Sequence, residues 1–429
     1  MNRFLLALLG ALAVPSAMTW AQESAPAQPR WWKGNLHTHS LWSDGDDFPE
    51  MIGDWYRSQG YHFLALTDHN TLSEGMRWMK ASAIVKRSDA DVLRKYKERF
   101  GEHWVETRGD PASEDHEFRL KPLSEFRGML EQSGRFLLIP AEEISDRAGA
   151  KMIHINATNL AETIPPAGGD SVRDVMRNNL RAIFAHEKEH GSSVLPHVNH
   201  PNFGYSITAE DLAAVTSEKF FEVYNGHPGV NHLGDQDHPS VERIWDLANA
   251  IRRTKVNVAP LMGIATDDSH EYHGKPGSRP GRGWVMVRSR FLTPEHLIEA
   301  MKRGDFYASS GVTLKTVSFN EGSNTLSLEI QPEDDAVYRT DFIATLRPEG
   351  DSDLQIGVRV ASVDGAAASY TLTGRELYVR AVVHSSAPHR DPSYKGQLQQ
   401  AWTQPVGWNH PERSFAHNQD DTAGTQDAP

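Results

Sequence analysis

The chain has 429 residues, a formal net charge of −13 and no cysteine. This acidic balance argues against a nucleic-acid partner, because it offers no basic surface to a phosphate backbone. The lack of cysteine excludes disulfides, thiolate metal sites and a cysteine nucleophile. A hydrophobic content of 38% is enough for a packed core, and the length fits one large α/β unit with an accessory module.

Residues 1–21 are predicted to form a secretory signal peptide. Asn2 and Arg3 precede an apolar run at residues 4–14, and Ala21 closes a tolerable cleavage site. The run is shorter than the roughly 20 residues that a bilayer span requires, and no later segment is long and apolar enough to span. We therefore expect a periplasmic or secreted protein with no membrane span after signal cleavage.

Strands and helices alternate over residues 31–312. Strands are predicted at 31–36, 61–67, 136–140, 152–157, from 194 onward, at 220–224, 258–265 and 284–287, and helices at 49–59, 122–132, 172–190, 209–215, 241–253 and 294–303. The charged stretch at 80–119 is expected to be a helical insertion and loop outside the core. The alternation is typical of parallel strands joined by crossover helices, which predicts an α/β fold.

Seven of these strands are followed by His, Asp or Glu. In the first motif, NLHTHSLWSDG, His37 and His39 share one face of an extended segment, and Asp44 lies on the turn that follows. Neutral imidazole is a good ligand for zinc or iron, and a carboxylate adds a hard oxygen ligand. In barrels and open α/β sheets the carboxyl ends of the strands form the active-site face, so these polar side chains are expected to meet there.

From about residue 313 the pattern changes to short alternating segments. LSLEI, FIATLRP, IGVRVASV, SYTLT and LYVRAVVH predict an antiparallel β-sandwich over residues 313–408. Its histidines, His384 and His389, lie outside the strand-end motifs, so this region is predicted to supply no metal ligand. Residues 409–429 are polar and are expected to be disordered.

Six motifs together resemble the PHP family, the polymerase and histidinol phosphatase family of metal-dependent phosphoesterases. In chain order they are HTHSLWSDG, LTDHN, PAEEIS, KMIHINA, VNHPN and TDDSH. The resemblance implies a distorted seven-stranded (β/α) barrel over residues 31–312, with two or three metal ions at the strand ends. The order WVMVRS, helix, FYASSG and β-rich tail is similar to exported metallohydrolases related to carbaryl hydrolase.

The resemblance also implies nine metal ligands. They are His37, His39, Asp44, His69, Glu143, His154, His200, Asp268 and His270. Glu143 would bridge two of the ions, which are expected to be zinc, manganese or iron. Glu142 and Asp267 stand beside two of these positions and remain alternatives as ligands. The role of His197 remains open: it is either a core histidine or a residue that supports the metal ligands.

Four further residues are candidates for catalysis: Asp68, Asp267, Glu222 and Arg282. Asp68 and Asp267 are expected to orient ligating imidazoles. Arg279 and Arg282 could clamp a phosphate. A divalent metal lowers the pKa of bound water toward roughly 7, which provides a hydroxide nucleophile without serine or cysteine.

Three functions are compatible with these residues. The leading hypothesis is a hydrolase that uses a metal-bound hydroxide on a small-molecule ester, with a phosphoester as the first choice. The second cleaves an amide, carbamate or carboxylic ester at the same centre. The third is a non-catalytic, metal-loaded protein whose β-sandwich binds a glycan or a surface partner.

Overall fold

The computed structural model describes residues 28–333, 335–350 and 352–408. The expected signal peptide and the expected disordered tail lie outside these ranges, so both remain predictions. In the part of the chain that is described, no helix has the length and apolar character needed to cross a membrane.

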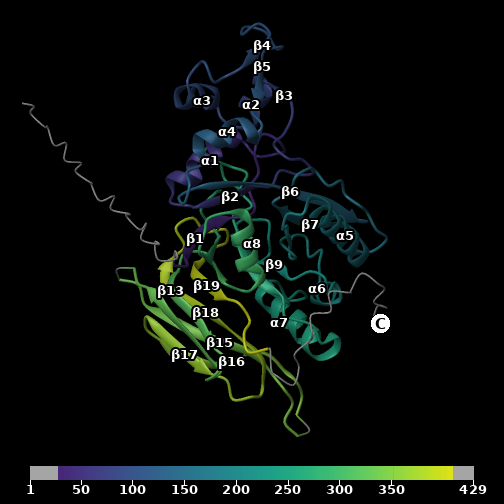
Figure 1. Cartoon of the computed structure of the whole chain (residues 1–429), viewed down its shortest axis with the longest axis vertical. Helices are drawn as coiled ribbons and strands as arrows, with labels where there is room; N and C mark the ends of the chain where they lie inside the picture. Colours follow the sequence, from purple (N-terminus) through teal and green to yellow (C-terminus); the bar gives the residue numbers. More distant parts are fainter. Residues whose placement is uncertain (1–27, 334, 351, 409–429) are drawn as a thin grey trace, which may run out of the picture.

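The fold is mixed α/β, and its largest element within the described residues is a sheet of thirteen strands (Figure 1). Nine of these strands come from the N-terminal region: β1 (Arg30–Asn35), β2 (Phe63–Leu66), β6 (Leu137–Ala148), β7 (Lys151–Thr158), β8 (Leu195–Val198), β9 (Phe220–Asn225), β10 (Met262–Thr266), β11 (Trp284–Ser289) and β12 (Phe306–Ser309). Their order in the sheet is β10-β9-β8-β7-β6-β2-β1-β11-β12. The predicted strands are therefore present, although β6 is longer and β10 shorter than expected.

Strand direction departs from the predicted parallel pattern at β7 and at β11, which pairs antiparallel with β1. β1, β2 and β6 pair in parallel, and so do β8, β9 and β10. β7 instead runs antiparallel to both β6 and β8. A tight turn at Gly149, whose φ is 61°, joins β6 to β7, and so short a connection can join only antiparallel strands. β6 consequently extends to Ala148, and Glu143 lies inside this strand instead of after it.

The predicted helices of the N-terminal region are present within a few residues of their expected bounds. They are α1 (Pro49–Ser58), α4 (Leu123–Leu130), α5 (Val172–His190), α6 (Ala209–Ala214), α7 (Val241–Ile251) and α8 (Pro294–Lys302). α5 begins where the Ser171 hydroxyl accepts the amide of Asp174, and it ends at Gly191, which has a left-handed φ of 65°. A π-helix over Arg252–Val256 continues α7.

The charged stretch at residues 80–119 contains a small sheet that its sequence does not indicate. Its helices are α2 (Ala81–Arg87) and α3 (Val92–Phe100), and its strands are β3 (Arg77–Lys80), β4 (Thr107–Arg108) and β5 (Glu117–Leu120). Apolar side chains of this insertion pack against Leu41 and Trp42, which lie within the first polar motif, and against Phe48, which follows it. The insertion therefore covers the loop after His39, and Figure 1 shows it at one end of the molecule.

The C-terminal strands continue the large sheet. β12 pairs with β19 (Leu398–Thr403), and the sheet then continues through β18 (Glu376–Pro388), β15 (Tyr338–Leu346) and β16 (Gln355–Asp364). A separate three-stranded sheet contains β13 (Thr313–Asn320), β14 (Thr325–Gln331) and β17 (Ala367–Thr371). Leu328 of the small sheet and Phe342 of the large one belong to one apolar cluster. The β-rich region is thus joined edge to edge to the α/β region (Figure 1).

A buried ion pair fastens α7 to the C-terminal strands. Arg380 of β18 donates through Nε and Nη2 to the two carboxylate oxygens of Asp246, at 3.0 and 2.8 Å. Tyr378 also donates to this carboxylate, at 3.1 Å. The side chains of Arg380 and Asp246 are 1% and 6% exposed, so water cannot replace either partner. Gly357 is needed opposite, because a Cβ there would lie 2.5 Å from Asp246.

Asp246→Asn should lower the free energy of unfolding by about 3–5 kcal/mol, because it leaves the Arg380 charge buried without an anion. Glu242→Gln is the matched control. Glu242 lies 3.5 Å from the same arginine but is 35% exposed, so its loss should cost less than about 1 kcal/mol. Urea denaturation followed by circular dichroism measures both variants. Equal losses would contradict the anchoring role of Asp246.

Glu50 of α1 is a buried carboxyl that faces the insertion. It accepts hydrogen bonds from the Tyr96 hydroxyl and, at 3.1 Å, from Nε1 of Trp104. Burial outweighs these hydrogen bonds and raises the pKa of Glu50 to about 7. The folded protein therefore holds this carboxyl in its protonated form below that pH.

The raised pKa of Glu50 should make stability fall as pH rises. The unfolded group ionises near pH 4.5 and the folded group near pH 7, so the folded state binds more protons between these values. The contribution lost across this window is on the order of 3 kcal/mol. Glu50→Gln should flatten the dependence, because an amide does not titrate. Urea denaturation at both ends of the window tests this, and identical pH slopes for the variant and the wild type would contradict it.

Candidate metal centre

The first polar motif is positioned between two strand ends. After β1 ends at Asn35, Thr38 forms an isolated parallel bridge with Ser269, beyond the end of β10. The amide of His39 also donates to the carbonyl of Ser269, at 2.9 Å. These contacts bring the first motif, HTHSLWSDG, beside the last one, TDDSH.

Glu143 lies at the centre of a cluster of histidines. Its side chain is 1% exposed, and imidazole nitrogens approach both of its carboxylate oxygens. The nitrogen–oxygen distances are 2.7 Å for His69, 2.9 Å for His154, 3.3 Å for His37, 3.4 Å for His39 and 3.5 Å for His200. A carboxylate whose two oxygens face different imidazoles has the geometry to bridge two cations.

Two aspartates complete the cluster. Oδ1 of Asp268 lies 3.2 Å from Nε2 of each histidine of the first motif. Asp44, whose side chain is 53% exposed, lies 3.5 Å from His69 and 3.3 Å from His270. Overlapping subsets of these side chains have ligand atoms within 4.8 Å of one another. All nine positions implied by the family resemblance are therefore together, with Asp268 at the buried end and Asp44 at the solvent end.

The cluster fits a divalent metal. Nε2 of His37, His39 and His154 and Oε2 of Glu143 are buried and take part in no hydrogen bond of normal geometry among the described residues, although Nδ1 of His69 lies 2.7 Å from that carboxylate oxygen. Each such atom costs about 1–3 kcal/mol when it stays unpaired, and bound metal would satisfy all four. Imidazole nitrogen combined with carboxylate oxygen suits zinc, manganese or iron. The cluster is thus capable of binding metal ions.

Burial and crowding shift the pKa values of the cluster in opposite directions. Burial opposes the charge of Glu143, but neighbouring imidazoles, led by His154, outweigh it and hold the pKa of Glu143 well below its usual range. Burial, reinforced by adjacent imidazoles, lowers the pKa of His39 to about 3. At His270 burial is outweighed by Asp44, which raises the pKa to about 9. An ionised Glu143 and a neutral His39 are the protonation states that metal ligands require.

Glu222 of β9 supports the cluster through hydrogen bonds. Its Oε1 lies 2.7 Å from Nδ1 of His37 and accepts the Thr266 hydroxyl, also at 2.7 Å. A partner at Nδ1 orients the ring of His37 and leaves Nε2 free for the cluster. Oε2 accepts the amide of His200 at 2.8 Å. The φ of His200 is 21°, so this hydrogen bond also holds a backbone conformation that is costly for a non-glycine residue.

Asp68 and Asp267 contact loops instead of imidazoles, which corrects the role expected for them. Asp68 accepts the amide and hydroxyl of Ser40 at 2.8 and 2.7 Å, and the hydroxyl of Ser43 at 2.6 Å. Asp267 accepts the amides of residues 281–283 at 2.9, 2.6 and 2.7 Å. Asp68 therefore positions the segment between His39 and Asp44, and Asp267 holds the loop at residues 281–283.

Arg282 also differs from expectation. Its side chain is 3% exposed, and its Nη1 donates to the carbonyls of Gly226 and Gly277, both at 2.8 Å. Its Nε donates to Asp391 at 3.1 Å, and Arg279 pairs with the same aspartate. Asp391 therefore pairs with both guanidinium groups, and its single negative charge offsets only one of their two positive charges. The correction comes from the C-terminal region, whose contact with these arginines the sequence pattern does not reveal.

The structure distinguishes the two adjacent glutamates. On β6 successive side chains alternate between faces, and Glu142 points away from the cluster to accept the amide of Ile164 at 2.6 Å. Burial raises the pKa of Glu142 to about 7. Glu143 is the member of the pair that lies in the cluster. In the aspartate pair, the same holds for Asp268, because Asp267 is bonded to the loop at residues 281–283.

The other histidines in question contact Glu222 or the C-terminal region, and His197 forms a metal-capable group with His37 and Glu222. His197 is fully buried, and its Nε2 is 3.5 Å from Glu222, so it packs beside the support of the cluster. His384 lies 3.2 Å from Gln400 within the C-terminal region. Nε2 of His389 lies 2.9 Å from the carbonyl of Arg282. Neither C-terminal histidine contacts a residue of the central cluster in these hydrogen bonds.

Two residues near the cluster were not among the candidates. Asn199 donates through Nδ2 to Glu143 at 2.7 Å and to Asn156 at 2.9 Å. Its place directly before His200 in VNHPN is the only sequence signal for this role. His227 is half-buried, and its ring centroid lies 5.8 Å from that of His270. Burial lowers the pKa of His227.

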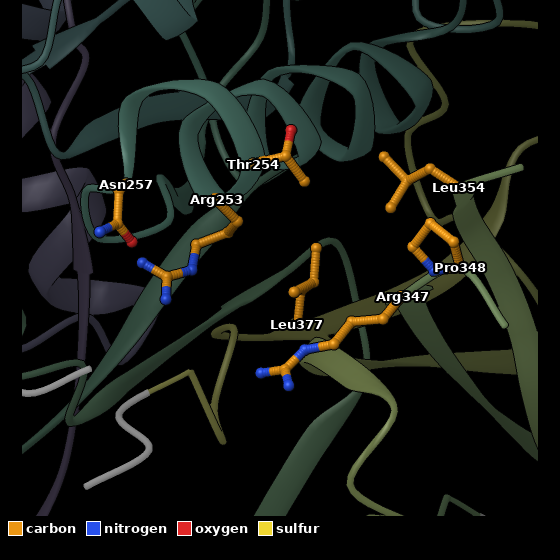
Figure 2. Close-up of a pocket in the computed structure, with 7 residues that line it drawn as sticks. All are labelled: Arg253, Thr254, Asn257, Arg347, Pro348, Leu354 and Leu377. Atoms are coloured by element: carbon orange, nitrogen blue, oxygen red, sulfur yellow. The ribbon is translucent and has the colours of Figure 1, made fainter. Parts of the chain in front are cut away.

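A cavity of about 530 Å³ lies between the π-helix after α7 and the C-terminal strands (Figure 2). Arg253, Asn257, Arg347 and Leu377 are among its lining residues. No histidine or carboxylate from the described residues lines it, so it lacks the ligands for a metal. The candidate site is therefore the histidine and carboxylate cluster.

Comparison with known proteins identifies no family. No family profile and no curated protein matches the chain. A two-domain protein from Bacteroides vulgatus containing a predicted PHP-like metal-dependent phosphoesterase is 17% identical, with a TM-score of 0.37 over 90% of this chain and 100% of that one. A proposed metal-dependent phosphoesterase from Bifidobacterium adolescentis is 14% identical, with a TM-score of 0.29 over 59% of this chain and 92% of that one. Similarity of this degree establishes no relationship.

Glu143→Gln should lose one or more metal ions per chain, because a neutral amide cannot offer anionic oxygens to two cations. Glu142→Gln is the matched control, since it changes the adjacent residue of the same strand on the opposite face. Plasma emission spectrometry of the two purified variants measures metal per chain, and circular dichroism checks the fold. If only Glu142→Gln loses metal, then Glu142 is the ligand and Glu143 is not.

Proposed function

We propose that this protein is a metal-dependent hydrolase whose substrate is a small-molecule phosphoester. The observation that carries the proposal is the convergence of five imidazoles on the buried carboxylate of Glu143. The buried ligand atoms without hydrogen-bond partners among the described residues support metal binding over an ordinary hydrogen-bond network.

The donors support two or three adjacent ion positions. The proposed sets are His37, His39, Glu143 and Asp268 for the first ion, Glu143, His154 and His200 for the second, and Asp44, His69 and His270 for the third. Zinc, manganese and iron suit these mixed donors. When bound, such ions supply Lewis acidity and a water molecule whose pKa is lowered toward roughly 7.

The residues of the chain have separate roles in this proposal. Glu143 provides the anionic charge shared between two positions, and Asn199 fixes its carboxylate by a hydrogen bond of 2.7 Å. Glu222 holds His37 at 2.7 Å and so sets the direction of its ligand nitrogen. Asp44 is 53% exposed, so the substrate is proposed to approach from its side of the cluster.

Membership of the PHP family is part of the proposal. The six ordered motifs support it, as does the parallel pairing of β1, β2 and β6 and of β8, β9 and β10. The bridge between Thr38 and Ser269 supports closure of the seven strands from β1 to β10 into a distorted barrel. We also propose a β-sandwich for the C-terminal region and export to the periplasm or the outside, the latter from the signal-like residues 1–21.

Hydrolysis of a carboxylic ester, carbamate or amide is the second candidate. The observation in its favour is the pairing of Arg279 and Arg282 with Asp391, because a carboxylate already in contact with both guanidinium groups competes with a phosphate for them. A neutral ester needs no such cation. A phosphoester at this site would have to be bound by the metal ions and by hydrogen-bond donors at the solvent end.

Removing metal with a chelator should lower the rate of p-nitrophenyl phosphate hydrolysis by about 100-fold or more, and zinc, manganese or iron should restore it. The same assay with p-nitrophenyl acetate separates the two candidate substrates. His384→Asn, in the C-terminal region, should behave as wild type in every assay. Full activity after metal removal would refute the proposal, and a preference for the acetate would favour the second candidate.

A further inference from the structure

His227 lies beside the cluster but belongs to none of its metal-capable groups in the described structure. It comes two residues after the end of β9, and its half-buried ring stands edge-on to His270, with 5.8 Å between centroids. Phe203 also contacts the ring, at 5.5 Å between centroids. The side chain therefore lies near the solvent end of the cluster, where a substrate is proposed to approach.

The proton of the neutral His227 ring is fixed on one nitrogen. The amide of Gly229 donates to Nδ1 at 2.9 Å, and a backbone amide can only donate, so Nδ1 carries no proton. The neutral ring must then carry its proton on Nε2. Among the described residues, the hydrogen bond to the ring is the one at Nδ1, and Nε2 accepts or donates none. Gly229 allows this close approach, because a Cβ there would lie 2.9 Å from Nδ1.

The backbone around His227 is held from several directions. The amide of His227 donates to the side chain of Asn225 at 2.8 Å, and the amide of Gly226 donates to Thr266 at 2.9 Å. Arg282 donates to the carbonyl of Gly226 at 2.8 Å. A donor on so constrained a turn is pre-organised, because little conformational freedom remains to be lost when a ligand binds.

We propose that the Nε2–H group of His227 donates a hydrogen bond to a phosphoryl oxygen of the substrate. The inference rests on the proposed function, since it requires a phosphoester at the metal centre. Arg279 and Arg282 both pair with Asp391, so His227 supplies a donor that no carboxylate holds in the described hydrogen bonds. Loss of one fixed donor to the charge that develops in a reaction lowers the rate by about 100- to 1000-fold.

The test compares three substitutions of His227 in the zinc-loaded protein. His227→Phe removes the donor, His227→Asn brings an amide near the Nδ1 position, and His227→Gln brings one near Nε2. His238→Gln is the control on the same loop, because His238 stacks on Tyr205, at 3.7 Å between centroids, outside the cluster. The measurements are zinc per chain, kcat/KM on p-nitrophenyl phosphate, and the affinity for inorganic phosphate by calorimetry.

Zinc content should stay at the wild-type value in all four variants. His227→Phe and His227→Asn should lose about 100-fold in kcat/KM and at least about 10-fold in phosphate affinity, and His227→Gln should recover part of both. Loss of zinc from His227→Phe would overturn the proposal, because His227 would then be a ligand. Wild-type kinetics in His227→Phe, or a Gln variant no better than the Asn variant, would also overturn it.

Failure of the proposed function has a different signature. If the wild type hydrolyses no phosphoester, the proposed function is wrong, and phosphate affinity in the wild type and His227→Phe then decides the role of His227 alone. A measurement on the unsubstituted, metal-free protein avoids any folding defect. Its imidazole nitrogen spectrum should show His227 protonated at Nε2, and a proton on Nδ1 would overturn the inference.

Discussion

The structure depends on the burial of one negative charge. The carboxylate of Glu143 has almost no contact with water, and a charge in that position is tolerable only where opposite charge or hydrogen-bond donors surround it. Histidines from separate segments meet this requirement, together with the amide of Asn199. Since these segments lie on different strands, the requirement fixes how the strand ends must meet. The arrangement of strands that buries the charge of Glu143 is therefore also the arrangement that makes the cluster capable of binding metal.

The sequence predicts the parts of the site that reside in short motifs. The spacing of His37 and His39, and the turn at Asp44, are local features, and the structure has all three in the cluster. Parallel strands are predicted from the alternation of strands and helices, but the reversal at β7 is decided by the short turn at Gly149. The extension of β6 follows from the same turn, so the length of this strand could not be predicted from its apolar run alone.

Long-range pairing is what the sequence pattern cannot supply. Arginine is a residue type that commonly binds phosphate, yet Arg282 forms an ion pair with Asp391, which follows β18 in the C-terminal region. Aspartate is a residue type that commonly orients a ligating imidazole, yet Asp267 accepts hydrogen bonds from three backbone amides. In both cases the residue type is compatible with two roles, and a partner from a distant part of the sequence determines which role the side chain has. Glu222 is the opposite case, because its strand-end position already suggested a place near the site.

The bridge between Thr38 and Ser269 has a consequence for the order of assembly. Its two residues are separated by most of the α/β region, so the ends of β1 and β10 meet only after a long loop has closed. Contacts of such long range form slowly, because the entropy of closing the loop is lost before the contact energy is gained. On a ribosome, the first metal-binding motif emerges long before its last partner. The proposed ligands can therefore come together as a full set only after synthesis has passed β10, so capture of metal by this cluster would belong to the late stage of folding.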